Sequence, residues 1–214
     1  MLQELSVSDH MNWLAHLFIS EKSIDFQLGN LLADPLKGKS WEGASRQLEA
    51  GLKMHSCIDS FTDSNVYVSK SKSRLRSKGY LKSVIIDIAY DYLLIKNWND
   101  YSKISLECFI HTFYTNAGVA IEEYPDDARH FVQRLIDYRV LNGYGSFRGL
   151  ETAFRRVDNR LSGRILAKES AVEYLPVLKR EITGIEKDFS CFFPQLVEYF
   201  RSKVESPLED HWLK

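Results

Sequence analysis

Apolar residues recur along most of this chain at intervals of three and four positions, the spacing that places side chains on one face of an α-helix. Helix-forming residues dominate, glycine and proline are sparse, and no segment has the composition of a linker between domains. With 214 residues, 44% of them hydrophobic, the chain is long enough to bury one sizeable core. The pattern predicts an all-α, single-domain helical bundle. The expected helical segments are residues 11–20, 26–38, 47–61, 83–98, 106–121 and 126–145, and a final core-closing helix that includes 189–200.

The segment 51–65 carries the most informative polar residues. His55, Asp59 and Asp63 follow one another at four-residue steps, so a helix places all three on one face. The residues between them are largely apolar, which predicts that much of the segment is buried. Ionisable groups in such a place require a partner or a function.

Three further apolar segments carry polar residues of the same kind. Asp87 and Asp91 lie one turn apart in the most apolar segment, Asn30 and Asp34 are also four residues apart, and His16 stands on the first helix. Burying an isolated carboxylate costs several kcal/mol unless it finds a metal, a cationic partner or a shared proton. Taken singly, a buried histidine is commonly structural, and an aspartate before a proline commonly caps a turn. The repetition across four helices favours a shared site.

A divalent metal ion explains these groups together. It offsets the cost of burying several carboxylates, and helices can present imidazole and carboxylate ligands around an open-sided site. The predicted ligands are Asp34, His55, Asp59 and Asp91. This mixed set of nitrogen and oxygen ligands suits Mn²⁺, Fe²⁺ or Mg²⁺ better than a structural zinc site. The expected chemistry is hydrolysis, in which the metal activates water and a neighbouring carboxylate, Asp63 or Asp87, accepts a proton.

A basic run follows the 47–61 segment. Its cations, which have no acidic residue among them, are Lys70, Lys72, Arg74, Arg76, Lys78 and Lys82. In a chain of net charge −1, this imbalance predicts a docking surface for an acidic partner. Aromatic residues are few in the run, so single-stranded nucleic acid is a weaker interpretation. A second basic stretch, residues 146–168, also contains acidic residues and is interpreted as a solvated face.

Composition and charge limit the partners and the cellular location that are expected for this protein. A net charge of −1 gives no global attraction to nucleic acid or membranes. No stretch is apolar over the length needed to span a bilayer, and the N-terminus lacks the pattern of a secretory signal, so a cytoplasmic location is expected. Residues 1–10 precede a second methionine and lack apolar periodicity, a pattern that indicates an N-terminal extension or a misassigned start. The three widely spaced cysteines form neither a disulfide framework nor a zinc-binding pair and are expected in the core.

Four motifs occur in a fixed order along the chain: MNWLAHL, GNLLAD, GLKMHSCIDSFTD and DIAYDYLL, which begin at residues 11, 29, 51 and 87. In this order and at these intervals they resemble the acyl carrier protein phosphodiesterase family, a divergent all-helical relative of the HD-domain metal-dependent phosphohydrolases. The resemblance covers nearly the whole chain from Met11 onward, and its specificity lies in the ordered set. It implies an HD-domain-like fold over residues 11–214.

The resemblance also implies an activity and a set of site residues. Members of the family hydrolyse the phosphodiester that joins 4′-phosphopantetheine to a serine of holo acyl carrier protein, with Mn²⁺ as the usual metal. Motif positions carry over Asp34, His55, Asp59 and Asp91 as metal ligands, His16 as a further ligand, and Asn30 as a substrate-binding residue. Carrier proteins are strongly acidic, so the basic run agrees with this substrate. The expected docking residues are Lys70, Lys72, Arg74 and Arg76.

Two positions depart from the family pattern. Ser56 stands where arginine usually follows the central histidine, and Tyr92 stands where histidine usually follows the second carboxylate of the later helix. The first change would weaken phosphate contact, since serine cannot supply the bidentate fork of arginine. Two other functions therefore remain open. One is a phosphohydrolase that acts on a nucleotide or another small phosphodiester with the same residues, and the other is a non-enzymatic module that binds an acidic carrier protein.

Overall fold

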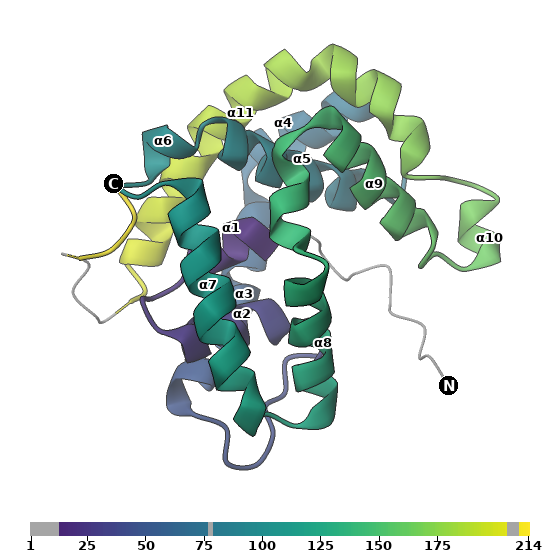
Figure 1. Ribbon diagram of the computed structural model, residues 1–214. Helices are drawn as coiled ribbons and strands as arrows, with labels where there is room; N and C mark the ends of the chain where they lie inside the picture. The colour runs from purple at the N-terminus through teal and green to yellow at the C-terminus, as the bar shows by residue number, and fades with distance from the viewer. Residues whose placement is uncertain (1–12, 77–78, 205–209) are drawn as a thin grey trace.

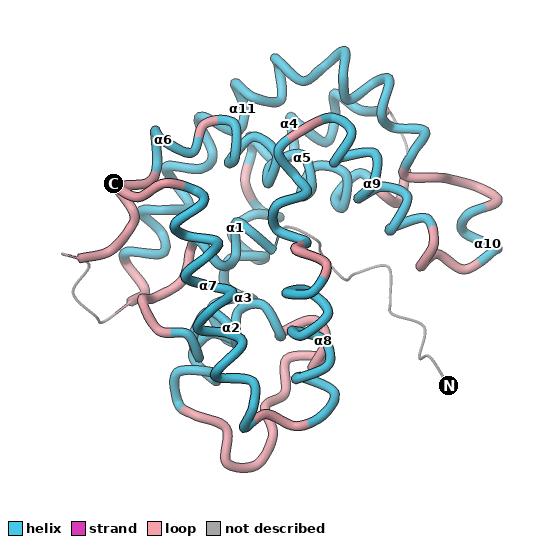
Figure 2. Tube along the Cα trace, viewed as in Figure 1, coloured by secondary structure: helices cyan, strands magenta, loops and turns pink. Residues whose placement is uncertain are grey.

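The computed structural model describes residues 13–76, 79–204 and 210–214, and the regular structure in these ranges is helical (Figures 1 and 2). The prediction of an all-α bundle is confirmed. The predicted extension at residues 1–10 lies outside the described residues. None of the described helices is long and apolar enough to cross a membrane.

The helices follow one another around one main apolar core. In chain order the α-helices are α1 (Trp13–Phe18), α2 (Ile24–Leu32), α3 (Arg46–Ser64), α4 (Val66–Leu75), α5 (Lys82–Lys96), α6 (Trp98–Tyr101), α7 (Leu106–Ala120), α8 (Asp126–Asp137), α9 (Phe147–Asp158), α10 (Gly163–Leu166) and α11 (Leu175–Arg201). The short 3₁₀ helices are η1 (Ile121–Glu123), η2 (Val140–Gly145) and η3 (Val172–Tyr174). Figure 1 shows α11 as a long arc over one end of the molecule, against α4.

The closest helix packing joins α2 to α3. Serine side chains at Ser23 and Ser45 cap the first turns of these helices by accepting backbone N–H groups. Gly29 and Gly51 lie where the helices cross, and a Cβ at either position would overlap a backbone carbonyl of the other helix, that of Leu48 or Phe26. Only glycine permits this approach, which brings the backbone of α2 within reach of side chains on α3.

Several expectations from the sequence need correction. The segment 126–145 is not one helix, because α8 ends at Asp137 and Arg139 adopts a left-handed conformation with φ of 45° before η2 begins. The basic run, for which the sequence predicts no helix, begins within α4, which contains Lys70, Lys72 and Arg74, and ends at the first residue of α5, Lys82. Cys108 and Cys191 are exposed, so their predicted place in the core is wrong, and Cys57 is only partly buried. Each exposed cysteine lies on the outer face of an amphipathic helix, α7 or α11.

Candidate metal site

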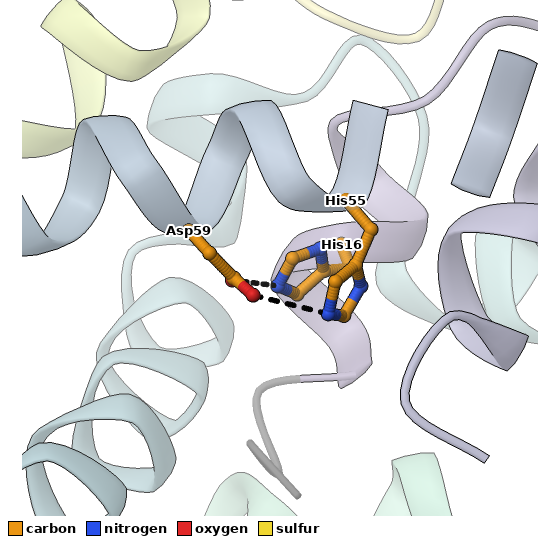
Figure 3. Close-up of side chains that lie close together, drawn as sticks. All are labelled: His16, His55 and Asp59. Carbon is orange, nitrogen blue, oxygen red and sulfur yellow. Dashed lines mark ion pairs between the residues drawn. The ribbon is translucent and has the colours of Figure 1, made fainter. Parts of the chain in front are cut away.

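Two histidines and one aspartate converge between α1 and α3. Figure 3 shows His16 reaching from α1 toward His55 and Asp59, which stand one turn apart on α3. The imidazole rings are stacked with their centroids 4.1 Å apart. Nε2 of His16 lies 3.3 Å from one carboxylate oxygen of Asp59, and Nε2 of His55 lies 3.2 Å from the other. One ligand atom from each residue lies within 4.8 Å of the others, which is the arrangement that a metal ion requires.

Asn30 of α2 fixes both imidazole rings. Its side-chain oxygen is 2.8 Å from Nδ1 of His16, and its backbone oxygen is 2.7 Å from Nδ1 of His55. The side-chain amide donates to the carbonyls of His16 and Ile19 and to the hydroxyl of Ser20, which fixes its orientation. Both partners of the Nδ1 atoms are acceptors, so each Nδ1 carries a proton. In the neutral rings the lone pairs are therefore on Nε2, toward Asp59.

The polar atoms at the centre of this group lack hydrogen bonds. Nε2 of His16, Nε2 of His55 and Oδ2 of Asp34 are buried and have no hydrogen-bond partner. Buried polar atoms are normally satisfied, so three such atoms in one place need an explanation. Asp34, in the turn after α2, also places Oδ1 3.3 Å from Nε2 of His55. Two imidazole nitrogens beside two carboxylates form a donor set that fits a divalent cation once the nitrogens are deprotonated.

The carboxylates control the charge of His55. Burial lowers the pKa of His55, but the carboxylates of Asp34 and Asp59, 3.3 Å and 3.2 Å from its Nε2, outweigh burial and raise this pKa from 6.5 to about 10. Burial raises the pKa of Asp59, but the two histidines outweigh it and hold this pKa below its ordinary value. A positive charge between the histidine Nε2 atoms and the carboxylate oxygens therefore stabilises the group. A proton supplies it in the metal-free protein, and a divalent cation would replace that proton.

Asp91, a predicted metal ligand, binds backbone N–H groups in this structure. It is fully buried on α5, and its two oxygens accept the backbone N–H groups of Leu14 and Ala15 at distances of 3.1 Å and 2.9 Å. These are donors at the start of α1 that have no partner within the helix, so Asp91 caps the helix that carries His16. Burial raises the pKa of Asp91, while the two amide hydrogen bonds act in the opposite direction. Asp87 is buried one turn earlier on α5.

The structure places Asp63 apart from the histidines. The face that begins with His55 and Asp59 emerges from the core at Asp63, whose side chain is 60% exposed and forms an ion pair of 2.9 Å with Lys72. The expectation that much of segment 51–65 is buried therefore holds only for its first part. Neither Asp63 nor Asp87 belongs to the group formed by His16, His55 and Asp59.

Several cations of the basic run form ion pairs within the protein, which the sequence does not predict. Arg74 pairs at 2.7 Å with Asp188 of α11, whose side chain is only 8% exposed, and Arg76 pairs at 3.6 Å with Glu173 of η3. Together with Lys72, three of the four expected docking residues already have carboxylate partners, while Lys70 is exposed and lies 4.9 Å from the centre of the Tyr67 ring. Asp188 and Glu173 come from distant parts of the chain, whereas Asp63 precedes Lys72 by nine residues.

The sequence indicates that Asn30 and Asp91 are unusual residues, but it does not indicate how they support the site. Both were identified as polar residues on apolar helices, but the contacts that they make cross from one helix to another. Asn30 is fully buried, and the described structure accounts for all of its side-chain polar atoms within the protein. Ser56 is exposed on α3, and Tyr92 packs against Phe147 of α9 with ring centroids 5.4 Å apart.

Comparison with known proteins places this chain in a family. The family model described as acyl carrier protein phosphodiesterase matches residues 11–196, a range that contains every residue of the candidate site. The chain belongs to this family. Membership confirms the resemblance found in the four sequence motifs. No solved structure matches the chain, so the similarity to the HD-domain fold stays a prediction.

Relatives named acyl carrier protein phosphodiesterase differ in how much of the chain they match. The protein from Enterobacter sp. (strain 638) is 23% identical over 195 residues, which cover 90% of this chain and 99% of the relative. The protein from Escherichia coli (strain K12 / DH10B) is 29% identical over 163 residues, or 68% and 83%. The protein from Photorhabdus laumondii is 35% identical over 104 residues, or 47% and 52%, so that match spans about half of the relative.

Proposed function

We propose that this protein is a metal-dependent phosphodiesterase that releases 4′-phosphopantetheine from holo acyl carrier protein and leaves the apo carrier protein. Family membership supports the reaction and the substrate. The observation that carries the metal-dependent chemistry is the pair of buried Nε2 atoms, on His16 and His55, that face Asp59 without hydrogen bonds. We expect the reaction to take place in the cytoplasm.

His16, His55 and Asp59 would hold the metal, and Asp34 beside His55 would be a fourth ligand. Two nitrogen and two oxygen donors suit Mn²⁺, with Fe²⁺ and Mg²⁺ as alternatives. When bound, such an ion activates a water molecule and polarises a phosphoryl oxygen. Asp91 is predicted from sequence to be a ligand as well, but its two amide hydrogen bonds favour a role in positioning α1.

The protein's own groups orient the site and move protons. Asn30 keeps both Nδ1 atoms protonated, so that the Nε2 atoms remain available as ligands. In the reaction, the oxygen of water forms a new bond to phosphorus, the bond from phosphorus to the serine oxygen breaks, and that oxygen takes up a proton. Asp63 and Asp87 remain the proposed acid–base residues. Asp63 would need to leave its ion pair with Lys72 to take part.

The carrier protein would dock on the exposed face of α4, which adjoins the end of α3 that carries Asp59. Lys70 contributes an exposed cation that has no ion-pair partner among the described residues. Arg74 and Arg76 remain proposed docking residues, although their charges are partly neutralised by Asp188 and Glu173. Complementary charge of this kind affects mainly the rate of encounter and the salt dependence.

The deciding experiment is the intact mass of holo acyl carrier protein after incubation with this protein, in parallel with Mn²⁺ and with a chelator. We expect conversion to the apo mass only with Mn²⁺, together with release of phosphopantetheine. The His55→Ala variant should lose turnover and Mn²⁺ binding. His111→Ala is the matched control, because His111 is exposed on α7 and outside the site.

No conversion by folded, Mn²⁺-loaded protein would overturn the proposed substrate. Hydrolysis of a nucleotide or a simple phosphodiester by the same preparation would then support a phosphohydrolase of different specificity. Tight binding of the carrier protein without turnover of any substrate would support a binding module.

A further inference from the structure

A second polar feature, lined in part by α1, has no role in the proposed reaction. A cavity of about 390 Å³ opens between α1, α8, η2 and α9. This volume is within the range of small-molecule sites. Its walls combine aromatic rings with three arginines, Arg134, Arg156 and Arg160. We refer to it as the arginine pocket.

The aromatic wall of the arginine pocket adjoins the metal site. Trp13 lies three residues before His16 on α1, so their Cβ atoms are about 5–6 Å apart on neighbouring positions of one helix face. Phe131 of α8 packs edge-to-face on Trp13 with ring centroids 5.7 Å apart. The two rings form an apolar part of the pocket wall.

Two of these arginines lack the partners that similar residues have elsewhere in this protein. Arg134 and Arg156 make no ion pair and no side-chain hydrogen bond with the described part of the chain, although Arg156 is half-buried. Arg155, the neighbour of Arg156 on α9, pairs with Glu151 at 2.7 Å. No acidic side chain is among the described residues that line the pocket. Guanidinium groups gathered in this way attract an anion, and phosphate matches their fork geometry.

Tyr144 adds a hydroxyl group to the pocket. It lines the pocket, and it is only 2% exposed. Burial raises the pKa of Tyr144, nearby Asp91 adds to the rise, and Arg156 and Arg160 oppose it. The hydroxyl therefore stays protonated at neutral pH and can donate to an anion.

We propose that the arginine pocket binds a phosphomonoester on an organic body, with the phosphate on Arg134 and Arg156 and the organic part along Trp13 and Phe131. The site goes beyond the proposed hydrolysis, because it needs no metal. Two sources share this chemistry: the 4′-phosphopantetheine that the reaction would release, and a nucleotide. The aliphatic arm of 4′-phosphopantetheine suits the wall next to His16, so we expect it to bind more tightly than adenosine 5′-monophosphate.

Calorimetric titration of the full-length protein tests this site. The ligands are 4′-phosphopantetheine, pantetheine, adenosine 5′-monophosphate and inorganic phosphate, each measured with a chelator and with Mn²⁺. In both conditions we expect 4′-phosphopantetheine to bind at least about tenfold more tightly than pantetheine or phosphate. Arg134→Met and Arg156→Met should each weaken it about tenfold, the value of one charge-assisted contact. Arg155→Met is the matched control on α9 and should bind like the original protein, with an unchanged melting temperature for all three variants.

Equal affinity for pantetheine and 4′-phosphopantetheine would contradict binding through the phosphate. Equal affinity of the Arg155 and Arg156 variants for 4′-phosphopantetheine would contradict binding in the arginine pocket. Binding of inorganic phosphate as tightly as the ester would overturn recognition of an organic body. Tighter binding of adenosine 5′-monophosphate with the same arginine dependence would support the site and assign it to a nucleotide. Since no turnover is measured, failure of the proposed hydrolysis would not change these results.

Discussion

At the scale of single residues, the site depends on one asparagine as much as on its ligands. Asn30 contacts the Nδ1 atoms of both histidines and also binds the end of α1 through His16, Ile19 and Ser20. Residues that orient a metal ligand typically change metal affinity by about 10–100-fold when they are removed. A residue that contacts no substrate can thus determine whether the site forms.

Replacing Asn30 with alanine should weaken Mn²⁺ binding about 10–100-fold, because Nδ1 of His16 loses its acceptor. The same change leaves buried carbonyls unpaired and should lower the free energy of unfolding by about 2–4 kcal/mol. Calorimetric Mn²⁺ titration and urea unfolding measure the two effects. Asn159→Ala, at an exposed position after α9, should change stability by less than about 0.5 kcal/mol. Unchanged Mn²⁺ affinity in folded Asn30→Ala would show that the asparagine does not orient His16.

At the scale of elements, the site depends on how closely α2 and α3 approach. Gly29 and Gly51 allow each helix backbone to touch the other, and this contact brings the carbonyl of Asn30 to 2.7 Å from His55. Gly51 is one turn before His55 on the same helix. Spacing between the helices and ligand geometry are therefore coupled.

The Gly51→Ala variant should lose about 1–3 kcal/mol of stability, because its methyl group overlaps the carbonyl of Phe26 and the helices must separate. Mn²⁺ affinity should fall as well, since His55 moves away from α2. Gly118→Ala is the control: Gly118 lies in α7 with nothing within 4 Å of a new Cβ, and the change should add about 0.5–1 kcal/mol. Urea unfolding with and without Mn²⁺ compares the two. Equal stability of the variants would contradict the close helix contact.

At the scale of the whole molecule, long-range ion pairs change the expected docking surface. Reversing Arg74 would leave Asp188 buried without its partner, and would therefore affect folding as well as docking. Reversing Lys72 would break its pair with Asp63. Lys70 is the exposed position on α4 where charge can be changed without breaking an ion pair between described residues.

We expect Lys70→Glu to raise KM for holo acyl carrier protein and to make KM less dependent on salt, because one attractive charge becomes repulsive. The rate with a small phosphodiester should not change. Lys103→Glu, at an exposed position between α6 and α7, is the control. Steady-state kinetics at several salt concentrations measure the effect. A parallel loss on both substrates would argue against docking through α4.

The end of the chain contributes a pH-dependent contact to the whole fold. Nε2 of His211 donates to the carbonyl of Ser20 at 2.8 Å, and its Nδ1 accepts the N–H of Leu213 at 3.1 Å, so the contact requires a neutral ring. Burial, the largest influence, lowers the pKa of His211. Trp212 donates to the carbonyl of Phe18, and this joins the same segment to the end of α1.

His211 should make the protein less stable in acid. Its pKa is lower in the folded state, so its contribution is complete above the unfolded pKa of about 6.5 and is lost as the pH falls through the folded value. The urea midpoint of the original protein should therefore fall more between pH 7.5 and 5.5 than that of His211→Gln. His130→Gln, at an exposed position on α8, should behave like the original protein. An identical pH response in His211→Gln would remove His211 as the cause.

The sequence by itself determined the helical class, the family and the chemical types in the site. Apolar periodicity is a local property, and the spacing of His55 and Asp59 places them on one helix face whatever surrounds them. The tertiary structure decided which polar residues meet. It joined His16 to Asp59, assigned Asp91 to the start of α1, and paired Arg74 and Arg76 with carboxylates far along the chain. These contacts depend on how helices cross, which is set by packing across the whole core rather than by spacing along the chain.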